Sequence, residues 1–260
     1  MKKFFVIGAM LLAAVSYAAD QVIDLSKPEA WAQKVVKAGP AAGTLCVNTN
    51  VIINTKAMFP VDDKHTYNFR GTVCAVAKGK IAGNSFIGYY LYDKDKKYIG
   101  QINADTLKGS ITTLAEPIKK GATTFKIKAN NAWKPAGHHY LGFNVKADEL
   151  CRDTIFSFVK KVEKDGANMI ITVSRPIYKD YPAGTAVAIQ KSGSYFYSSI
   201  VKPGANDRTF QNPLKQKNFW KKTAYISPMI LVNWSLPAKV DKSKVETMYK
   251  DLKLVIKEIK

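Results

Sequence analysis

Aromatic rings beside lysines and arginines in predicted loops are the residues of this chain best suited to bind a ligand. A pyranose stacks its apolar face on an exposed ring, while its hydroxyl groups meet neighbouring hydrogen-bonding groups. Cations around such a ring would hold a carboxylate or a sulfate. The candidates are Arg70, Trp133, Tyr178, Tyr181, Tyr195, Tyr197, Arg208 and Trp220. The alternative for each ring is packing at the end of a β-sandwich, and for Arg70 a solvated face or a structural ion pair.

Signatures of catalysis are missing from the sequence. It has no GxSxG nucleophile elbow, no HExxH zinc motif, no P-loop and no glycine-rich dinucleotide turn. The acidic residues Glu116, Glu149, Glu163 and Asp207 offer no facing pair for glycoside hydrolysis. One enzymatic alternative stays open, a polysaccharide lyase in which Tyr or His removes a proton beside a uronate carboxylate. The sequence favours a non-catalytic binding protein.

No cofactor is expected. His138 and His139 are adjacent in an extended segment, so their side chains point to opposite faces, and His65 stands apart from them. Asp93 and Asp95 lie in a lysine-rich turn without the cluster of oxygen ligands that calcium needs. A structural calcium is therefore an alternative that the residues do not support.

Three cysteines leave at least one thiol unpaired. Cys46 and Cys74 lie in predicted strands, and they could either pair across neighbouring strands or be buried as small apolar residues. Cys151 lies in a polar loop. None of the spacings resembles a zinc site.

The first nineteen residues have the three-part layout of a secretory signal peptide. Lys2 and Lys3 precede an apolar run from Phe4 to Val15, and small residues follow. The run is shorter than the roughly 20 residues that span a bilayer, although a retained anchor is the alternative. The sequence therefore predicts a bacterial protein that is secreted, periplasmic or on the cell surface, with a mature chain over residues 20–260.

The chain is strongly basic, with a formal net charge of +20. Loss of Lys2 and Lys3 with the signal peptide reduces this charge to +18. Almost all of it is lysine, which provides diffuse positive charge rather than forked phosphate-binding groups. After export, an anionic polysaccharide (sulfated or uronate-rich) or a cell surface is a better partner than nucleic acid. The alternative is charge that serves solubility only.

Most of the mature chain is predicted to form strands. The exception is a short N-terminal helix that begins at Ser26, with Pro28 in its first turn, and ends at Gly39. Residues 65–77 alternate between apolar and polar, so Tyr67 and Phe69 should share one face while Arg70 lies on the other. Strands without intervening helices predict an antiparallel sandwich or barrel, in one domain.

The order of segments resembles the jelly-roll, galactose-binding-like domains of secreted bacterial carbohydrate-active proteins. The matching text includes YNFRGTV, GYYLYDKDKKYIGQI, NAWKPAGHHYLGFNV, YPAGTAVAIQ and the closing strand MYKDLKLVIKE. In that strand an acidic residue precedes alternating apolar positions, as in many carbohydrate-binding modules. The resemblance implies an all-β sandwich that binds sugars through loops at one end or across a sheet face. It also implies a structural calcium in many members.

The sequence therefore predicts an exported carbohydrate-binding protein that recognises an anionic polysaccharide. Two alternatives remain at this stage: a structural or assembly protein of the cell envelope, and a jelly-roll polysaccharide lyase. A stable oligomer would favour the first of these, and release of unsaturated uronate products would favour the second.

Overall fold

The computed structural model describes residues 20–135, 139–193, 195–236 and 239–259. The predicted signal peptide lies outside the described residues, as does His138. The chain is an all-β protein built from antiparallel sheets, which confirms the predicted sandwich class. Within the described ranges, no helix is both long and apolar enough to cross a bilayer.

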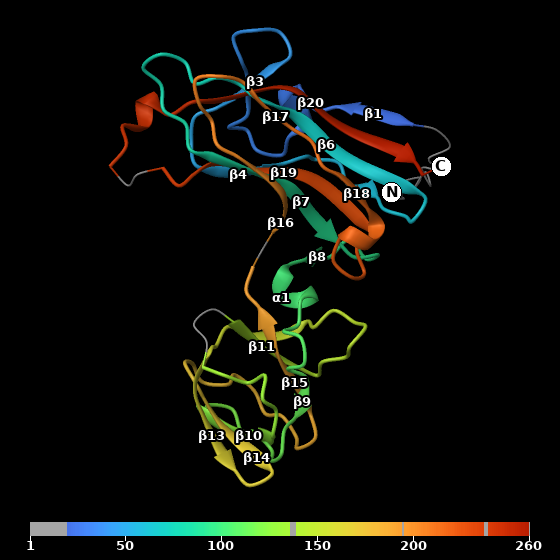
Figure 1. Ribbon diagram of the computed structural model, residues 1–260, viewed down its shortest axis with the longest axis vertical. Coiled ribbons are helices and arrows are strands. Elements are labelled where there is room, and N and C mark those ends of the chain that lie inside the picture. Colours follow the sequence, from blue (N-terminus) through green and yellow to red (C-terminus); the bar gives the residue numbers. More distant parts are fainter. Residues whose placement is uncertain (1–19, 136–138, 194, 237–238, 260) are drawn as a thin grey trace, which may run out of the picture.

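The larger part of the molecule contains two facing sheets (Figure 1). The seven-stranded sheet has the order β17-β6-β20-β3-β2, with β1 and β18 attached to β20 and β6. Its strands are β1 (Gln21–Asp24), β2 (Lys37–Ala38), β3 (Thr44–Val47), β6 (His65–Val73), β17 (Arg208–Phe210), β18 (Pro213–Lys215) and β20 (Thr247–Glu258). The six-stranded sheet has the order β16-β7-β19-β4, with β5 attached to β19 and β8 attached to β7. Its strands are β4 (Val51–Asn54), β5 (Phe59–Pro60), β7 (Asn84–Tyr92), β8 (Tyr98–Ile99), β16 (Phe196–Val201) and β19 (Tyr225–Trp234).

Alternation along the strands builds the core between these two sheets. Tyr67 and Phe69 of β6 are buried, as the sequence predicts, and they face Ile87 and Tyr89 of β7. The hydroxyl of Tyr89 accepts a hydrogen bond of 2.9 Å from the Phe69 backbone N–H. Because this buried hydroxyl has a partner, a tyrosine can occupy the core at this position.

A smaller part of the molecule is inserted between β8 and β16 (Figure 1). The chain enters it through α1 (Gln101–Ala104) and forms a three-stranded sheet, β10-β14-β13, and a four-stranded sheet, β12-β11-β15-β9. The bounds are β9 (Thr112–Thr113), β10 (Thr124–Lys128), β11 (His139–Phe143), β12 (Asp153–Ile155), β13 (Val159–Asp165), β14 (Asn168–Val173) and β15 (Ala186–Lys191). These strands enclose a hydrophobic cluster of their own. The described residues thus pack around two large clusters, and a single domain over residues 20–260 stays a prediction.

The predicted N-terminal helix is not confirmed. The chain forms only a 3₁₀ turn, η1 (Pro28–Ala30), and Lys27 precedes it without a side-chain cap. Trp31 then adopts an extended conformation, bridges Thr55, and buries its ring in the core. Its indole N–H donates to the Leu25 carbonyl at 2.9 Å. This tertiary packing outweighs the local helix signals, which are worth only tenths of a kilocalorie to about 1 kcal/mol per residue.

Two of the β-hairpins join β13 to β14 and β7 to β8, one in each part of the molecule. Asp165 and Asn168 close the hairpin between β13 and β14, and Gly166 adopts a φ of 59° in its turn. The second hairpin joins β7 to β8 through the turn after Asp93. Its second strand, β8, ends at Ile99, and α1 follows it.

Candidate ligand-binding site

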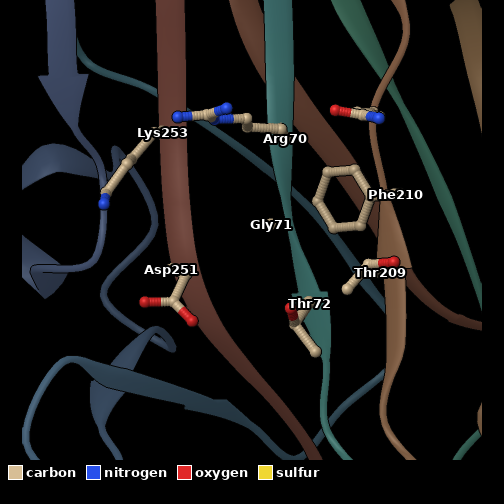
Figure 2. Close-up of a pocket in the computed structure, with 8 residues that line it drawn as sticks. Arg70, Gly71, Thr72, Thr209, Phe210, Asp251 and Lys253 are labelled. Carbon is tan, nitrogen blue, oxygen red and sulfur yellow. The ribbon is translucent and has the colours of Figure 1, made fainter.

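An open pocket of about 350 Å³ lies on the face of the seven-stranded sheet that points away from the core (Figure 2). Arg70 of β6 stands directly opposite Lys253 of β20, and Asp24 of β1 lies opposite Lys253 on its other side. In Figure 2 the Arg70 guanidinium extends across β20 towards Lys253, and the Asp251 carboxylate lies lower on the same strand. Like charges directly opposite each other destabilise a sheet, so this pair favours a bound anion.

A β-bulge in β20 creates this arrangement. Two residues of β20, Asp251 and Leu252, stand opposite the single residue Gly71 of β6. The extra residue reverses the alternation, so Lys250 and Lys253 both lie on the outer face while Leu252 is buried. Asp251 adopts a φ of 56°, in the left-handed region that Asp and Asn tolerate better than other side chains.

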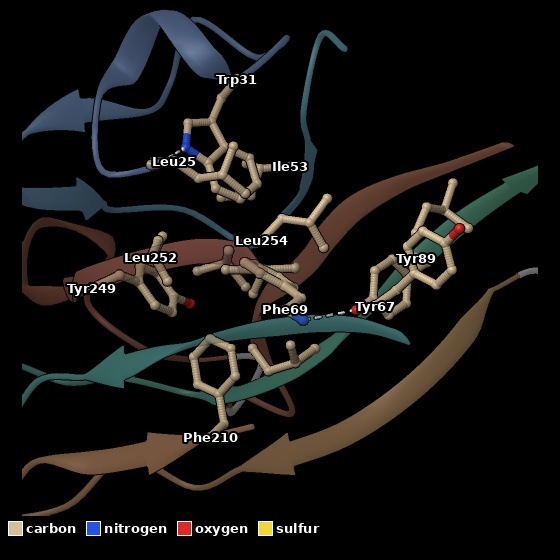
Figure 3. Packing of buried hydrophobic residues seen from close by; sticks show 14 of the residues in the cluster. Leu25, Trp31, Ile53, Tyr67, Phe69, Tyr89, Phe210, Tyr249, Leu252 and Leu254 are labelled. Carbon is tan, nitrogen blue, oxygen red and sulfur yellow. Dashed lines mark hydrogen bonds between the residues drawn. The ribbon is translucent and has the colours of Figure 1, made fainter. Parts of the chain in front are cut away.

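One residue that lines the pocket, Phe210, belongs to the core of the larger part of the molecule (Figure 3). Phe210 of β17 pairs with Gly71 and packs edge-on against Phe69, with ring centroids 5.5 Å apart. A Cβ atom on Gly71 would lie 2.5 Å from Cδ2 of Leu252. Glycine at this position therefore lets Leu252 fill the core beneath the bulge.

The charged groups of the pocket have electrostatic neighbours, Asp24 for Lys253 and Lys250 for Asp251, but no direct contact with them. Among the described residues, Arg70, Asp251 and Lys253 make no side-chain hydrogen bond and no ion pair. The adjacent Lys250 differs, because its Nζ lies 2.6 Å from Asp207 Oδ2. That contact, together with a hydrogen bond from the Ala75 N–H, holds the pKa of Asp207 below its ordinary value. Two cations and a carboxylate in one pocket are thus left to solvent or a ligand.

A second open pocket, of about 540 Å³, adjoins the first at Thr209. It is lined by Arg208 and Lys202, with Ile200 and Val201 of β16 beside them. The structure therefore brings two of the sequence candidates, Arg70 and Arg208, into adjoining pockets on β6 and β17. Lys253 and Asp251 were missed, because no sequence pattern marks the bulge that presents them.

Tyr195 and Tyr197 belong to a tyrosine cluster on the outer face of the six-stranded sheet, away from the charged pocket. The ring of Tyr90 lies edge-on to the rings of Tyr98 and Tyr195, at centroid distances of 5.4 Å for each. Burial raises the pKa of Tyr197 to about 12 and also raises the pKa of Tyr90 and Tyr92. The alternation along β7 could have predicted that Tyr90 and Tyr92 belong to this outer face, since both side chains point away from the face on which Tyr89 meets the core.

Tyr178 and Tyr181 lie in the smaller part and bind one carboxylate. Their hydroxyls donate to Asp153 Oδ1 at 2.8 and 2.9 Å, and Lys179 Nζ lies 2.9 Å from Oδ2. Burial acts to raise the pKa of Asp153, but the hydrogen bonds from Lys179 and the tyrosines outweigh it and lower the pKa. Tyr181 is only 3% exposed and stacks on Phe143 at 4.0 Å. Tyr178, at 48% exposure, offers more surface to a ligand.

Trp133 and Trp220, which the sequence predicts as exposed loop rings, are buried and half-buried in the structure. Trp133 is 2% exposed in the core of the smaller part, where its N–H donates to the Ser110 carbonyl. Trp220 is half-buried and packs edge-on against Phe196. Trp234 ends β19 with 47% of its surface exposed. Trp133 therefore has no open ring face for a sugar.

The cysteines are free. Cys46 pairs with Met248 of β20 on one side, and the Cys74 N–H donates to the Met248 carbonyl on the other. Two strand spacings, about 10 Å, thus separate Cys46 from Cys74, beyond the reach of a disulfide. Burial raises the pKa of both thiols and of Cys151. Pairing across neighbouring strands, which the sequence left open, does not occur because β20 lies between them.

Metal-binding geometry is not seen in the part of the chain that the structure describes, where no three His, Cys, Asp or Glu residues converge. Asp93, from the turn considered for calcium, accepts hydrogen bonds from the Asp95 and Lys97 N–H groups and from the Arg152 guanidinium. His65 is buried, with Nδ1 2.7 Å from Asp62. These contacts are structural.

Comparison with known proteins adds no relative. No family model, no curated protein and no solved structure matches this chain. The resemblance to galactose-binding-like domains therefore stays a prediction, and the functional argument depends on the geometry of the pocket.

Proposed function

We propose that this chain is an exported, non-catalytic protein that binds an anionic polysaccharide at the Arg70 pocket of the seven-stranded sheet and at the adjoining pocket between β17 and β16. One observation supports the proposal most directly. The sheet register holds two cations, Arg70 and Lys253, opposite each other, and neither makes an ion pair among the described residues. The rigid guanidinium fork of arginine matches a carboxylate or sulfate ester in two parallel hydrogen bonds.

The surroundings of the pair support a sugar polymer as the ligand. Thr72, Thr209 and Gln211 line the first pocket and supply neutral hydrogen-bonding groups for hydroxyls. The first pocket lies within the range of about 300–1,000 Å³ typical of small-ligand sites. The second pocket adjoins the first at Thr209 and adds two further cations, Arg208 and Lys202, for an anionic polymer.

Affinity electrophoresis through gels that contain polygalacturonate or dextran sulfate tests this proposal. The wild-type protein should be retarded at low salt, and Arg70→Gln should weaken binding by about two- to fivefold, the effect of one exposed ion pair. Arg175→Gln is the matched control, because it removes the same charge from an exposed position in the smaller part. Absence of retardation by any anionic polymer, or equal effects of both variants, would refute the proposal.

A second candidate, assembly within the cell envelope, is favoured by an exposed edge. Strand β16 ends the order of the six-stranded sheet, and its Ile200 is 62% exposed. Apolar side chains on an edge strand promote pairing with another chain. Size-exclusion chromatography with light scattering tests this candidate: a stable oligomer that Ile200→Lys dissociates would support it, and a monomer would refute it.

The environment of the tyrosine cluster disfavours its members as the base of a lyase. A lyase of this type needs a tyrosine or a histidine that takes up a proton near neutral pH, and a tyrosine in that role must first lose its own proton. Burial raises the pKa of Tyr90, Tyr92 and Tyr197 instead, which keeps their hydroxyls protonated. We expect no rise in the ultraviolet absorbance of uronate polymers on incubation with the protein, and such a rise would restore the lyase interpretation.

A further inference from the structure

We propose that Asp251 makes the Arg70 pocket selective for a sugar acid, a ligand with one carboxylate and free hydroxyl groups on each unit, over a densely charged anion. This inference rests on the proposed function, since it names the class of anionic polymer bound at the same pocket. It assigns Arg70 and Lys253 to the carboxylate and Asp251 to hydroxyl groups.

The first argument is that the pocket contains charges of both signs. A site for polyphosphate, nucleic acid or a heavily sulfated chain surrounds its ligand with cations, because each further anionic group needs compensation. This pocket holds an unpaired carboxylate, Asp251, in its lining, and Asp24 lies on the far side of Lys253. Every anionic group beyond the first would meet repulsion from Asp251.

The hydrogen-bonding capacity of a carboxylate carries the second step. An ionised carboxylate only accepts hydrogen bonds, and its two oxygens have about four acceptor sites. Sugar hydroxyls are donors, and hydrogen bonds to a charged acceptor are about twice as strong as neutral ones. Asp251 is exposed, and its carboxylate makes no hydrogen bond and no ion pair among the described residues, so these acceptor sites are available. Polyphosphate has no hydroxyl groups along its chain to offer them.

The third argument is the backbone conformation that the bulge imposes on Asp251. Asp251 is held with a φ of 56°, one of the few positive values at a non-glycine residue in the described chain. Such conformations cost of order 1–3 kcal/mol and cluster at ligand sites, and bulges re-aim side chains next to such sites. In β20 the bulge places Asp251 in the pocket together with Arg70 and Lys253, which pair with each other directly after the bulge.

The variant Asp251→Asn tests both proposed roles of Asp251, the repulsion of further anionic groups and the hydrogen bonds to sugar hydroxyls. Asparagine is isosteric and tolerates the left-handed backbone, so the fold and the bulge should be retained. The matched control is Asp148→Asn, which makes the same charge change at an exposed position in the smaller part. Two probes, oligogalacturonate and polyphosphate of equal total charge, are titrated calorimetrically against wild type and both variants at one low salt concentration.

The two probes should respond in opposite directions. We expect Asp251→Asn to weaken oligogalacturonate binding by about tenfold, through lost charged hydrogen bonds, and to strengthen polyphosphate binding by about two- to fivefold, through lost repulsion. Asp148→Asn should leave the ratio of the two affinities unchanged. Stronger binding of both probes by Asp251→Asn would overturn the inference while leaving the proposed function intact. Failure of the wild-type protein to bind any uronate polymer would overturn both.

Discussion

Replacement of Gly71 by alanine tests whether the bulge in β20 organises the pocket. The added Cβ would lie 2.5 Å from Cδ2 of Leu252 and 3.3 Å from the Lys250 carbonyl oxygen. Ordinary contacts of a Cβ begin at about 3.4 Å. Leu252 is fully buried, so its side chain cannot turn towards solvent to relieve the overlap. Overpacking of this kind costs about 1–3 kcal/mol.

Part of this cost is offset, because alanine reduces the entropy of the unfolded chain by about 0.4–1 kcal/mol. The net destabilisation relative to wild type should therefore be between about 0 and about 2.6 kcal/mol, or a fall in Tm of up to about 10 °C at this chain length. Urea unfolding followed by circular dichroism and tryptophan fluorescence provides the measurement. Gly204→Ala is the control, because a Cβ there has no atom within 4 Å.

The Gly71→Ala variant should also bind anionic polymers more weakly than wild type, because β20 must shift to admit the methyl group. A variant as stable as Gly204→Ala would refute the steric reasoning. A destabilised variant that keeps full affinity for anionic polymers would show instead that ligand binding does not depend on the bulge.

Three further predictions address the rest of the molecule. Because the pKa of Asp153 is lowered on folding, its stabilisation is present above the ordinary Asp pKa and is lost as pH falls through the folded-state value. Asp153→Asn should thus cost about 1–3 kcal/mol near pH 7 in urea unfolding, and less on acidification. Burial raises the pKa of Tyr197 from 10.0 to about 12, so stability should fall as pH rises through that interval, and less so in Tyr197→Phe. All three cysteines should react with an alkylating reagent after unfolding of air-exposed, unreduced protein, and mass spectrometry that finds a linked Cys46–Cys74 peptide would contradict the strand order.

The strand content and the alternation of β6 and β7 could be predicted because period-two patterns report which side chains face a core. The N-terminal segment could not, since Trp31 contributes to the core through an extended strand-like bridge to Thr55. Capping signals at Ser26 and Pro28 are local, and the burial of one tryptophan exceeds them in free energy.

The candidate site could be predicted in part. Arg70 and Arg208 were identified as cations on a polar strand face and in an irregular segment, and they line adjoining pockets. Among the rings, Tyr197 is partly exposed whereas Trp133 is buried, because residue type alone does not report which side of a loop faces the core. The free carboxylate of Asp251 went unrecognised, although its place before alternating apolar residues in MYKDLKLVIKE was noted.

The sequence by itself determined the strand-rich class, the excess of lysine and the faces of the regular strands, because these follow from composition and local periodicity. Only the tertiary structure decided the order of the strands, which separates Cys46 from Cys74 by β20 and sets Arg70 against Lys253. It also decided the bulge at Asp251. Strand order and register depend on contacts between residues distant in the chain, so no local pattern specifies them.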